Sequence, residues 1–173
     1  MVDKILVAYA STHGAMQEVA EKVAETLREQ GLSVDLRAAK DVKTLGGIGA
    51  VVLGGPLYMF RWHSDAIRFL NRHHKAITAG IPVAVFAGGP WEDKPEQFAD
   101  VRKNVDSILA KFPWLNPVSV EVVGGRFDPA HLRFPYSLIP AMKQMPASDA
   151  RDWDRIHAWA VELADAFGKE RVS

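Results

Sequence analysis

The sequence predicts an α/β fold of the doubly wound kind, a three-layer sandwich around a five-stranded parallel sheet in the order 2-1-3-4-5. Short apolar runs alternate along the chain with longer segments whose apolar residues recur at helical spacing. This alternation is typical of a parallel sheet covered by helices on both faces. Five strands within 173 residues suit that strand order. Ligands of such sheets bind beyond the carboxyl ends of strands 1 and 3, where the order reverses.

Five short apolar runs are the expected strands. The first, KILVAY, is continuous and bounded by polar residues, as a strand buried on both faces would be. The second, SVDLR, alternates between apolar and polar residues, and the third and fourth each end in a glycine pair. The runs cover residues 4–9, 33–37, 50–55, 82–89 and 117–125.

The segments between these runs carry the helical pattern. Apolar residues spaced three and four apart begin at Met16, and Gly31 stands where a glycine commonly ends a helix. The expected helices are 16–27, about 64–75, 96–112, and a last one beginning at Trp153. The segment Arg126–Arg151 is too long for an ordinary connection of about two to six residues. We therefore expect a single domain, 1–173, with an insertion at about 126–152 before the last helix.

Composition narrows the classes of function. The chain has no cysteine, which excludes disulfides, thiolate metal sites and cysteine catalysis, and no His, Asp or Glu spacing indicates a metal site. Lys+Arg and Asp+Glu are both 21, so no net charge favours nucleic acid. The start of the chain lacks a signal-peptide pattern, and no apolar run approaches the roughly 18 residues of a membrane span. We expect a cytoplasmic protein.

The loop after the first strand has the composition of a phosphate site. Its hydroxyls can bond phosphate oxygens, and its backbone N–H groups precede a helix, whose N-terminus favours anions. The loop carries no lysine, and the Walker and dinucleotide glycine motifs are both absent. The alternative is that a hydroxyl only caps the helix. The residues expected to bind phosphate are Ser11, Thr12, His13, Gly14, Ala15 and Met16.

Two later loops repeat one design, in which a strand ends in a glycine pair followed by aromatic residues. They read GGPLYMFRWH and GGPWE. Glycine lets the backbone approach a flat ligand, and a planar ring held between Tyr58 or Trp62 and Trp91 would account for the aromatic residues together. The alternative is that at least one aromatic side chain packs beneath its loop. The residues expected to contact the ring are Pro56, Leu57, Tyr58, Trp62, Gly88, Gly89 and Trp91.

These three loops resemble those of the flavodoxin superfamily, over roughly residues 4–125 and 153–168. Members of that superfamily bind flavin mononucleotide (FMN) through a first loop of the form S/T-x-T-G-x-T. Ser11, Thr12 and Gly14 match this form, whereas His13 and Met16 stand where threonines are usual. The resemblance implies FMN as the cofactor.

Within the superfamily, GGPLYMFRWHSDAIRFLNRH resembles the menaquinone-dependent protoporphyrinogen IX dehydrogenase group. That group also carries a basic and aromatic insertion after its fifth strand, which corresponds here to the apolar segment 126–152 with its interspersed Arg and Lys. The resemblance implies a hydrophobic substrate or quinone. For the insertion it leaves open a cover over the flavin, a peripheral contact with the inner face of the membrane, packing on its own domain and a homodimer interface.

Two histidines are candidates for chemistry. His63 is a candidate proton donor or substrate contact, and the alternative is that it caps the helix that follows it. His13 could add positive charge beside a bound anion when protonated. In flavoproteins the cofactor carries the redox chemistry, so the lack of an evident catalytic acid or nucleophile does not argue against an enzyme.

Three functions remain to be compared. The first is an FMN-dependent oxidoreductase linked to a quinone-like acceptor. The second is an electron carrier that serves a redox protein partner and has no substrate of its own. Such carriers are usually acidic, so zero net charge and the apolar insertion favour the enzyme. The third, a flavin-free signalling module, needs acidic residues where this chain has Ser11–His13 and Gly54–Gly55.

Overall fold

The structure is a computed structural model that describes residues 4–58, 60–90, 94–127, 129, 138–144 and 147–170. Five parallel strands form its centre in the order β2-β1-β3-β5-β6, and the short β4 pairs antiparallel with β3. Counted among the parallel strands alone, this is the predicted order 2-1-3-4-5, so the predicted fold class is confirmed. The strands are β1 (Lys4–Tyr9), β2 (Val34–Ala38), β3 (Ile48–Tyr58), β4 (Arg61–Trp62), β5 (Val83–Gly88) and β6 (Ser119–Val123).

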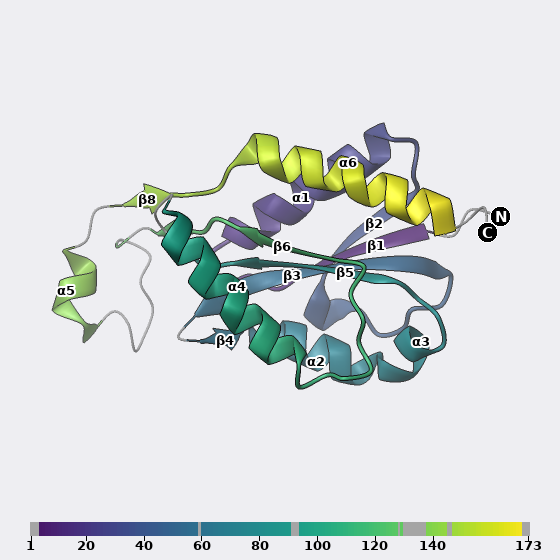
Figure 1. The fold of residues 1–173 in the computed structure, drawn as a ribbon, viewed down its shortest axis with the longest axis horizontal. Helices are drawn as coiled ribbons and strands as arrows, with labels where there is room; N and C mark the ends of the chain where they lie inside the picture. Colours follow the sequence, from purple (N-terminus) through teal and green to yellow (C-terminus); the bar gives the residue numbers. More distant parts are fainter. Residues whose placement is uncertain are drawn as a thin grey trace.

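Helices cover both faces of the sheet, as the alternation predicted. In Figure 1, α1 (Ala15–Glu29) and α6 (Trp153–Glu170) lie above the sheet, whereas α2 (Ser64–Arg72), α3 (His74–Thr78) and α4 (Pro95–Leu109) lie below it. A short 3-10 turn, η1 (Ala39–Asp41), follows β2.

The helix expected over 64–75 is two helices that meet at His73. This residue has a backbone φ of −102° and ψ of 16°, outside regular helical geometry. Its ring is buried, packs against Phe69 and places Nε2 3.2 Å from the carbonyl oxygen of Val42. That tertiary hydrogen bond ties the α2–α3 junction to the segment after η1, which sequence periodicity does not reveal.

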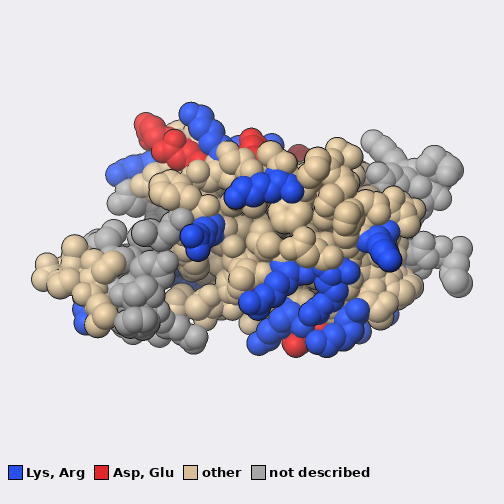
Figure 2. Space-filling view, turned by 90° about the horizontal axis from the view of Figure 1, so that it is seen from below, with Lys and Arg blue, Asp and Glu red and all other residues tan. Residues whose placement is uncertain are grey.

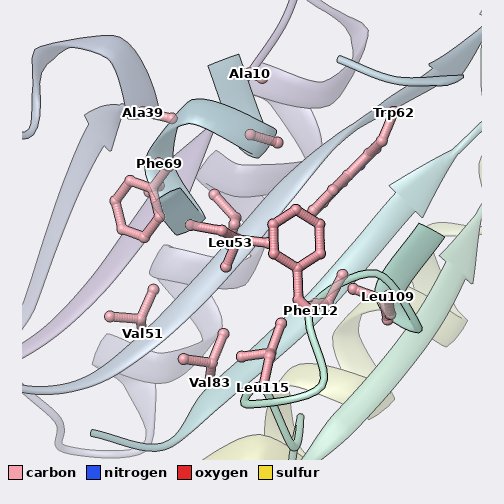
Figure 3. Close-up of a cluster of buried hydrophobic side chains, with 14 of the residues drawn as sticks. Ala10, Ala39, Val51, Leu53, Trp62, Phe69, Val83, Leu109, Phe112 and Leu115 are labelled. Carbon is pink, nitrogen blue, oxygen red and sulfur yellow. The ribbon is translucent and has the colours of Figure 1, made fainter. Parts of the chain in front are cut away.

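Each strand sends alternate side chains to opposite faces, so the sheet divides the core in two. Val51, Leu53 and Val83 pack below the sheet with Phe69 and Phe112, as Figure 3 shows. Strand residues at the alternate positions point upward and join the apolar stripes of α1 and α6; they include Ile5, Val7, Val52, Ala84 and Phe86. The doubled core explains why the strand sequences are nearly continuous apolar runs.

The described parts of the insertion lie outside the main sheet. It begins and ends in a small antiparallel pair, β7 (Arg126–Phe127) with β8 (Ser148–Asp149), and α5 (Pro140–Lys143) lies between them along the chain. In Figure 1, β8 and α5 lie at the end of the sheet where the parallel strands finish. No helix in the described part of the chain is both long and apolar enough to span a membrane.

Candidate cofactor site

A hollow of about 300 Å³, counted with the solvent space at its opening, lies at the carboxyl ends of β1, β3 and β5. It is placed where β1 and β3 adjoin and the strand order reverses, which is where doubly wound sheets bind ligands. All of its lining residues except Gly125 and Arg126 belong to the predicted site. The lining consists of Ser11, Thr12, His13, Ala15, Met16, Pro56, Tyr58, Gly88, Gly89, Gly125 and Arg126.

The first loop turns into α1 through Gly14, which adopts a left-handed backbone with φ of 84°. That conformation suits glycine, because it has no side chain to clash. The Gly14 N–H donates to the Ser11 hydroxyl oxygen over 2.9 Å. The next N–H groups, from Ala15 onward, belong to the first turn of α1 and have no acceptor within their own helix. Their residues line the hollow, so these donors suit an anion there.

His63 orients the hydroxyl of Thr12 in the first loop. It is the N-cap of α2, and its Nδ1 accepts the N–H of Asp65 over 3.1 Å. In the neutral ring the proton therefore sits on Nε2, which lies 3.2 Å from Thr12 Oγ1 and donates to it. The capping alternative for His63 is thus observed. Both ring nitrogens have protein partners, and its role as a proton donor to substrate stays a prediction.

Hydrogen bonding leaves this end of the hollow rich in donors. Ser11 Oγ accepts from Gly14 and Thr12 Oγ1 accepts from His63, so each hydroxyl keeps its own proton to donate. Together with the first-turn N–H groups of α1, these donors match the acceptor-only oxygens of a phosphate. The residues present therefore fit the phosphate of a nucleotide.

A cluster of four charged side chains joins this loop to the insertion. Glu18 in α1 receives Arg126 Nη1 on Oε1 at 2.9 Å and Arg151 Nη1 on Oε2 at 3.0 Å. Arg151 is buried and also binds Asp149 over 2.8 Å. Arg126 Nη2 donates to the carbonyl oxygen of His13 over 2.9 Å.

The two arginines stabilise the ionised form of both carboxylates. Burial raises the pKa of Glu18, but the hydrogen bonds and charges of Arg151 and Arg126 outweigh burial and leave that pKa below its ordinary value. The hydrogen bond from Arg151 likewise lowers the pKa of Asp149, and burial opposes it only in part. The same hydrogen bond to Asp149 stabilises the protonated guanidinium and raises the pKa of Arg151. Glu18, Asp149 and Arg151 are therefore charged at neutral pH.

The other end of the hollow is formed by Pro56, the half-buried Tyr58, and Gly88–Gly89. Gly88 and Gly89 line the hollow, and their expected role of admitting a flat ligand stays a prediction. A Cβ on Gly54 would overlap the ring of Phe86, and one on Gly88 would meet the side chain of Met16. The buried ring of Phe86 therefore requires glycine at position 54, whereas the atoms nearest Gly88 are the flexible end of the Met16 side chain.

Two residues of the predicted ring site do not reach the hollow. Trp62 is 5% exposed and donates its indole N–H to the carbonyl oxygen of Gly55 over 3.0 Å. Leu57 pairs with it across β3 and β4 and is also buried in the lower core. Stacking of a ligand on Trp62 does not fit this geometry, and the alternative of an aromatic residue packed beneath its loop applies. Trp91 lies outside the described residues.

Sequence reasoning missed Gly125 and Arg126. The signal was present, because β6 is also followed by a glycine pair, Gly124–Gly125, and then at once by an arginine. A Cβ on Gly124 would overlap the Ala150 backbone, so this glycine admits the chain that returns from the insertion. Gly125 then bonds both ways, donating to the Pro90 carbonyl over 2.6 Å and accepting from Ala150 over 3.0 Å.

The comparison with protein-family models assigns the chain to a family. The model of the flavodoxin domain family matches residues 6–147, and the chain belongs to this family. A search among curated proteins finds no significant match.

Solved structures show the same fold. The chain aligns with flavodoxin 2 of Bacillus cereus at a TM-score of 0.58 and 19% identity, covering 96% of this chain and 99% of that one. A flavodoxin of Streptococcus pneumoniae aligns at 0.59 and 17%, covering 94% and 99%. The rubredoxin oxygen:oxidoreductase of Desulfovibrio gigas aligns at 0.59 and 17%, covering 98% of this chain but only 37% of that longer one.

Flavodoxin domains bind FMN, and membership of the family therefore makes FMN the implied cofactor of this chain. The donor-lined loop fits its phosphate, and the hollow beside Tyr58 and Gly88–Gly89 continues from that loop. Among the described residues, no group of three or more His, Asp or Glu side chains is placed to hold a metal ion.

Proposed function

We propose that this protein is an FMN-dependent oxidoreductase that takes electrons from a hydrophobic donor and passes them to a quinone. Protoporphyrinogen IX is the proposed donor, because the second loop and the insertion resemble the menaquinone-dependent protoporphyrinogen IX dehydrogenase group. The donor would lose electrons and protons, and the quinone would gain them and leave as the quinol. Bound FMN supplies the hydride and electron transfer.

The protein's own residues would bind and orient the cofactor. Ser11, Thr12 and the start of α1 would hold its phosphate. Tyr58 would border the flavin ring from the β3 loop, and the Gly88–Gly89 backbone would border it from the β5 loop. His63 would keep the Thr12 hydroxyl turned toward the phosphate.

The observation that carries the enzyme proposal is the position of the insertion. Its first residue, Arg126, and the preceding Gly125 form part of the wall of the hollow. Leu138 and Ile139, next to α5, are 68% and 42% exposed. Apolar side chains on a segment rooted in the cofactor site suit a hydrophobic substrate better than a hydrophilic one.

A direct test uses purified protein with FMN, protoporphyrinogen IX under anaerobic conditions and a soluble menaquinone analogue, with no second protein present. We expect porphyrin fluorescence to appear and the quinone to be consumed in proportion. A folded, FMN-loaded protein that oxidises no porphyrinogen would contradict this substrate.

Deletion of 130–148 is the companion variant. If it stays folded, binds FMN and reduces quinone as before, the insertion does not shape the substrate site.

An electron carrier is the second candidate, and one observation favours it. Although the net charge is zero, Lys and Arg gather on the face formed by α2 and α3, seen in Figure 2. The exposed Lys and Arg of η1, of the segment after it and of α2 and α3 are Lys40, Lys43, Arg68, Arg72 and Lys75, and Asp41 is exposed among them. A face rich in Lys and Arg can steer an acidic redox protein. A carrier would reduce such a partner at a rate that falls with added salt, and it would leave porphyrinogen unchanged.

A further inference from the structure

Arg126 lies on the wall of the hollow, beside the phosphate loop. Its guanidinium places one N–H on Glu18 Oε1 and another on the His13 carbonyl oxygen, each over 2.9 Å. A guanidinium has five N–H donors, so these two bonds leave others for a ligand. An ideal Cβ on Gly14 would lie 3.9 Å from Nη2, which shows how closely the guanidinium approaches the turn into α1.

The phosphate loop itself contains no cation of the lysine or arginine kind. Of the two arginines next to it, Arg151 is only 4% exposed and is held between Glu18 and Asp149. Arg126 is 35% exposed and reaches the hollow. Arg126 is therefore the arginine of this cluster that can meet an anion without breaking a buried ion pair.

Glu18 works against an anion at the same place. It carries a full negative charge one turn into α1 and occupies part of the Arg126 fork. Within the cluster, Arg126 and Arg151 are balanced by Glu18 and Asp149, so a phosphate dianion adds uncompensated negative charge. The two partners of the Arg126–Glu18 ion pair should thus affect a phosphate in opposite directions.

We propose that Arg126 is the cationic ligand of the flavin phosphate and makes the site select phosphorylated flavin over riboflavin, while Glu18 weakens that selection by competing for the guanidinium. This inference rests on the proposed FMN site and names the residues that set its specificity. It also gives the insertion a role in cofactor binding, since Arg126 is its first residue.

The test measures the Kd of FMN and of riboflavin by quenching of flavin fluorescence in four proteins: the wild type, Arg126→Gln, Glu18→Gln and Arg155→Gln. We expect Arg126→Gln to weaken FMN about tenfold or more and to leave riboflavin within about twofold. We expect Glu18→Gln to tighten FMN by about threefold, again without moving riboflavin. Arg155 is the matched control, because it forms a 2.8 Å ion pair with Glu121 outside the hollow and its loss should change neither Kd.

Several outcomes would overturn the inference. If both substitutions weaken FMN, the pair only holds the loop in shape. If Arg126→Gln weakens FMN and riboflavin equally, the arginine does not read the phosphate. A wild type that binds both flavins equally keeps the FMN site and removes the selectivity, whereas a wild type that binds neither removes the proposed function itself. Should Arg126→Gln fail to fold, Arg126→Lys decides: it keeps the charge and should retain most of the preference for FMN.

Discussion

The loop after β1 and the loops after β3 and β5 meet around one hollow, but different interactions hold them. At the phosphate end, hydroxyls, an imidazole and an arginine are joined by hydrogen bonds between elements far apart in sequence, such as His63 with Thr12. Beside the ring end, Gly54 is fixed by its contact with the ring of Phe86, and Trp62 is packed in the lower core. The contacts of Ser11 and Thr12 therefore suit ligand binding, whereas Gly54 and Trp62 serve the packing of the core.

The largest effect should come from the ring end, in stability. Gly54→Ala would place a Cβ on the buried ring of Phe86, and overpacking of this kind costs about 3 kcal/mol. Urea denaturation should show a clearly lower midpoint. Gly46→Ala is the control, because its nearest atom would be Thr44 Oγ1 at an ordinary 3.6 Å. Equal midpoints for the two variants, with FMN binding lost only in Gly54→Ala, would restore the view that Gly54 admits the ligand.

Trp62→Phe tests whether this indole belongs to the core or to the ligand. The change leaves the buried Gly55 carbonyl without its donor and should lower the free energy of unfolding by about 2 kcal/mol. FMN affinity should stay within about twofold. Tyr58→Leu should instead weaken FMN binding and leave the free energy of unfolding nearly unchanged, because Tyr58 lines the hollow and is only half-buried. A Trp62→Phe protein with unchanged stability and weak FMN binding would place the indole against the flavin after all.

The phosphate end should respond in affinity rather than stability. His63→Asn keeps a good N-cap for α2 but is too short to reach Thr12, so its hydroxyl loses the donor that orients it. We expect the Kd for FMN to rise about fivefold, or roughly 1 kcal/mol, with no change for riboflavin. His63→Ala should add a loss of stability from the missing cap. An unchanged FMN Kd in His63→Asn would show that His63 serves only as a cap.

The smallest effects should appear in the pH dependence of stability, where the buried His73 of the α2–α3 junction and the carboxylates beside the phosphate end act in different pH ranges. Burial lowers the pKa of His73 below its ordinary 6.5, with the Val42 hydrogen bond opposing it. The unfolded chain then binds the proton more readily, so the stability that His73 contributes is present above pH 6.5 and is lost as pH falls below it. Glu18 and Asp149 have lowered pKa values as well, and their contribution is lost only below about 4.5 and 3.8.

Urea midpoints measured from pH 8 to pH 3 check this order. His73→Gln should remove the loss that begins near pH 6.5 and leave the steeper acid region in place. Glu18→Gln should reduce the loss at lower pH only. A wild-type midpoint that is constant down to pH 5 would contradict the role given to His73.

The order of strands and helices was predictable because each local period matches its layer. Buried parallel strands read as apolar runs, and α1 shows its buried face as Met16, Val19 and Val23. The boundaries that failed were those set by distant contacts. The helix over 64–75 divides at His73, whose buried ring bonds to the distant Val42 carbonyl, a contact that no local pattern records.

The sequence by itself determined the fold class, the family and the edge of the sheet at which the cofactor is expected, because these follow from periodicity and from the hydroxyl loop at Ser11–Met16. Only the tertiary structure decided which residues face the hollow. Trp62 points into the core, where its indole N–H satisfies the buried Gly55 carbonyl. Arg126 lines the hollow because it follows β6, whose carboxyl end lies beside α1. Direction of a side chain and pairing across the chain are properties of packing, and a linear pattern does not contain them.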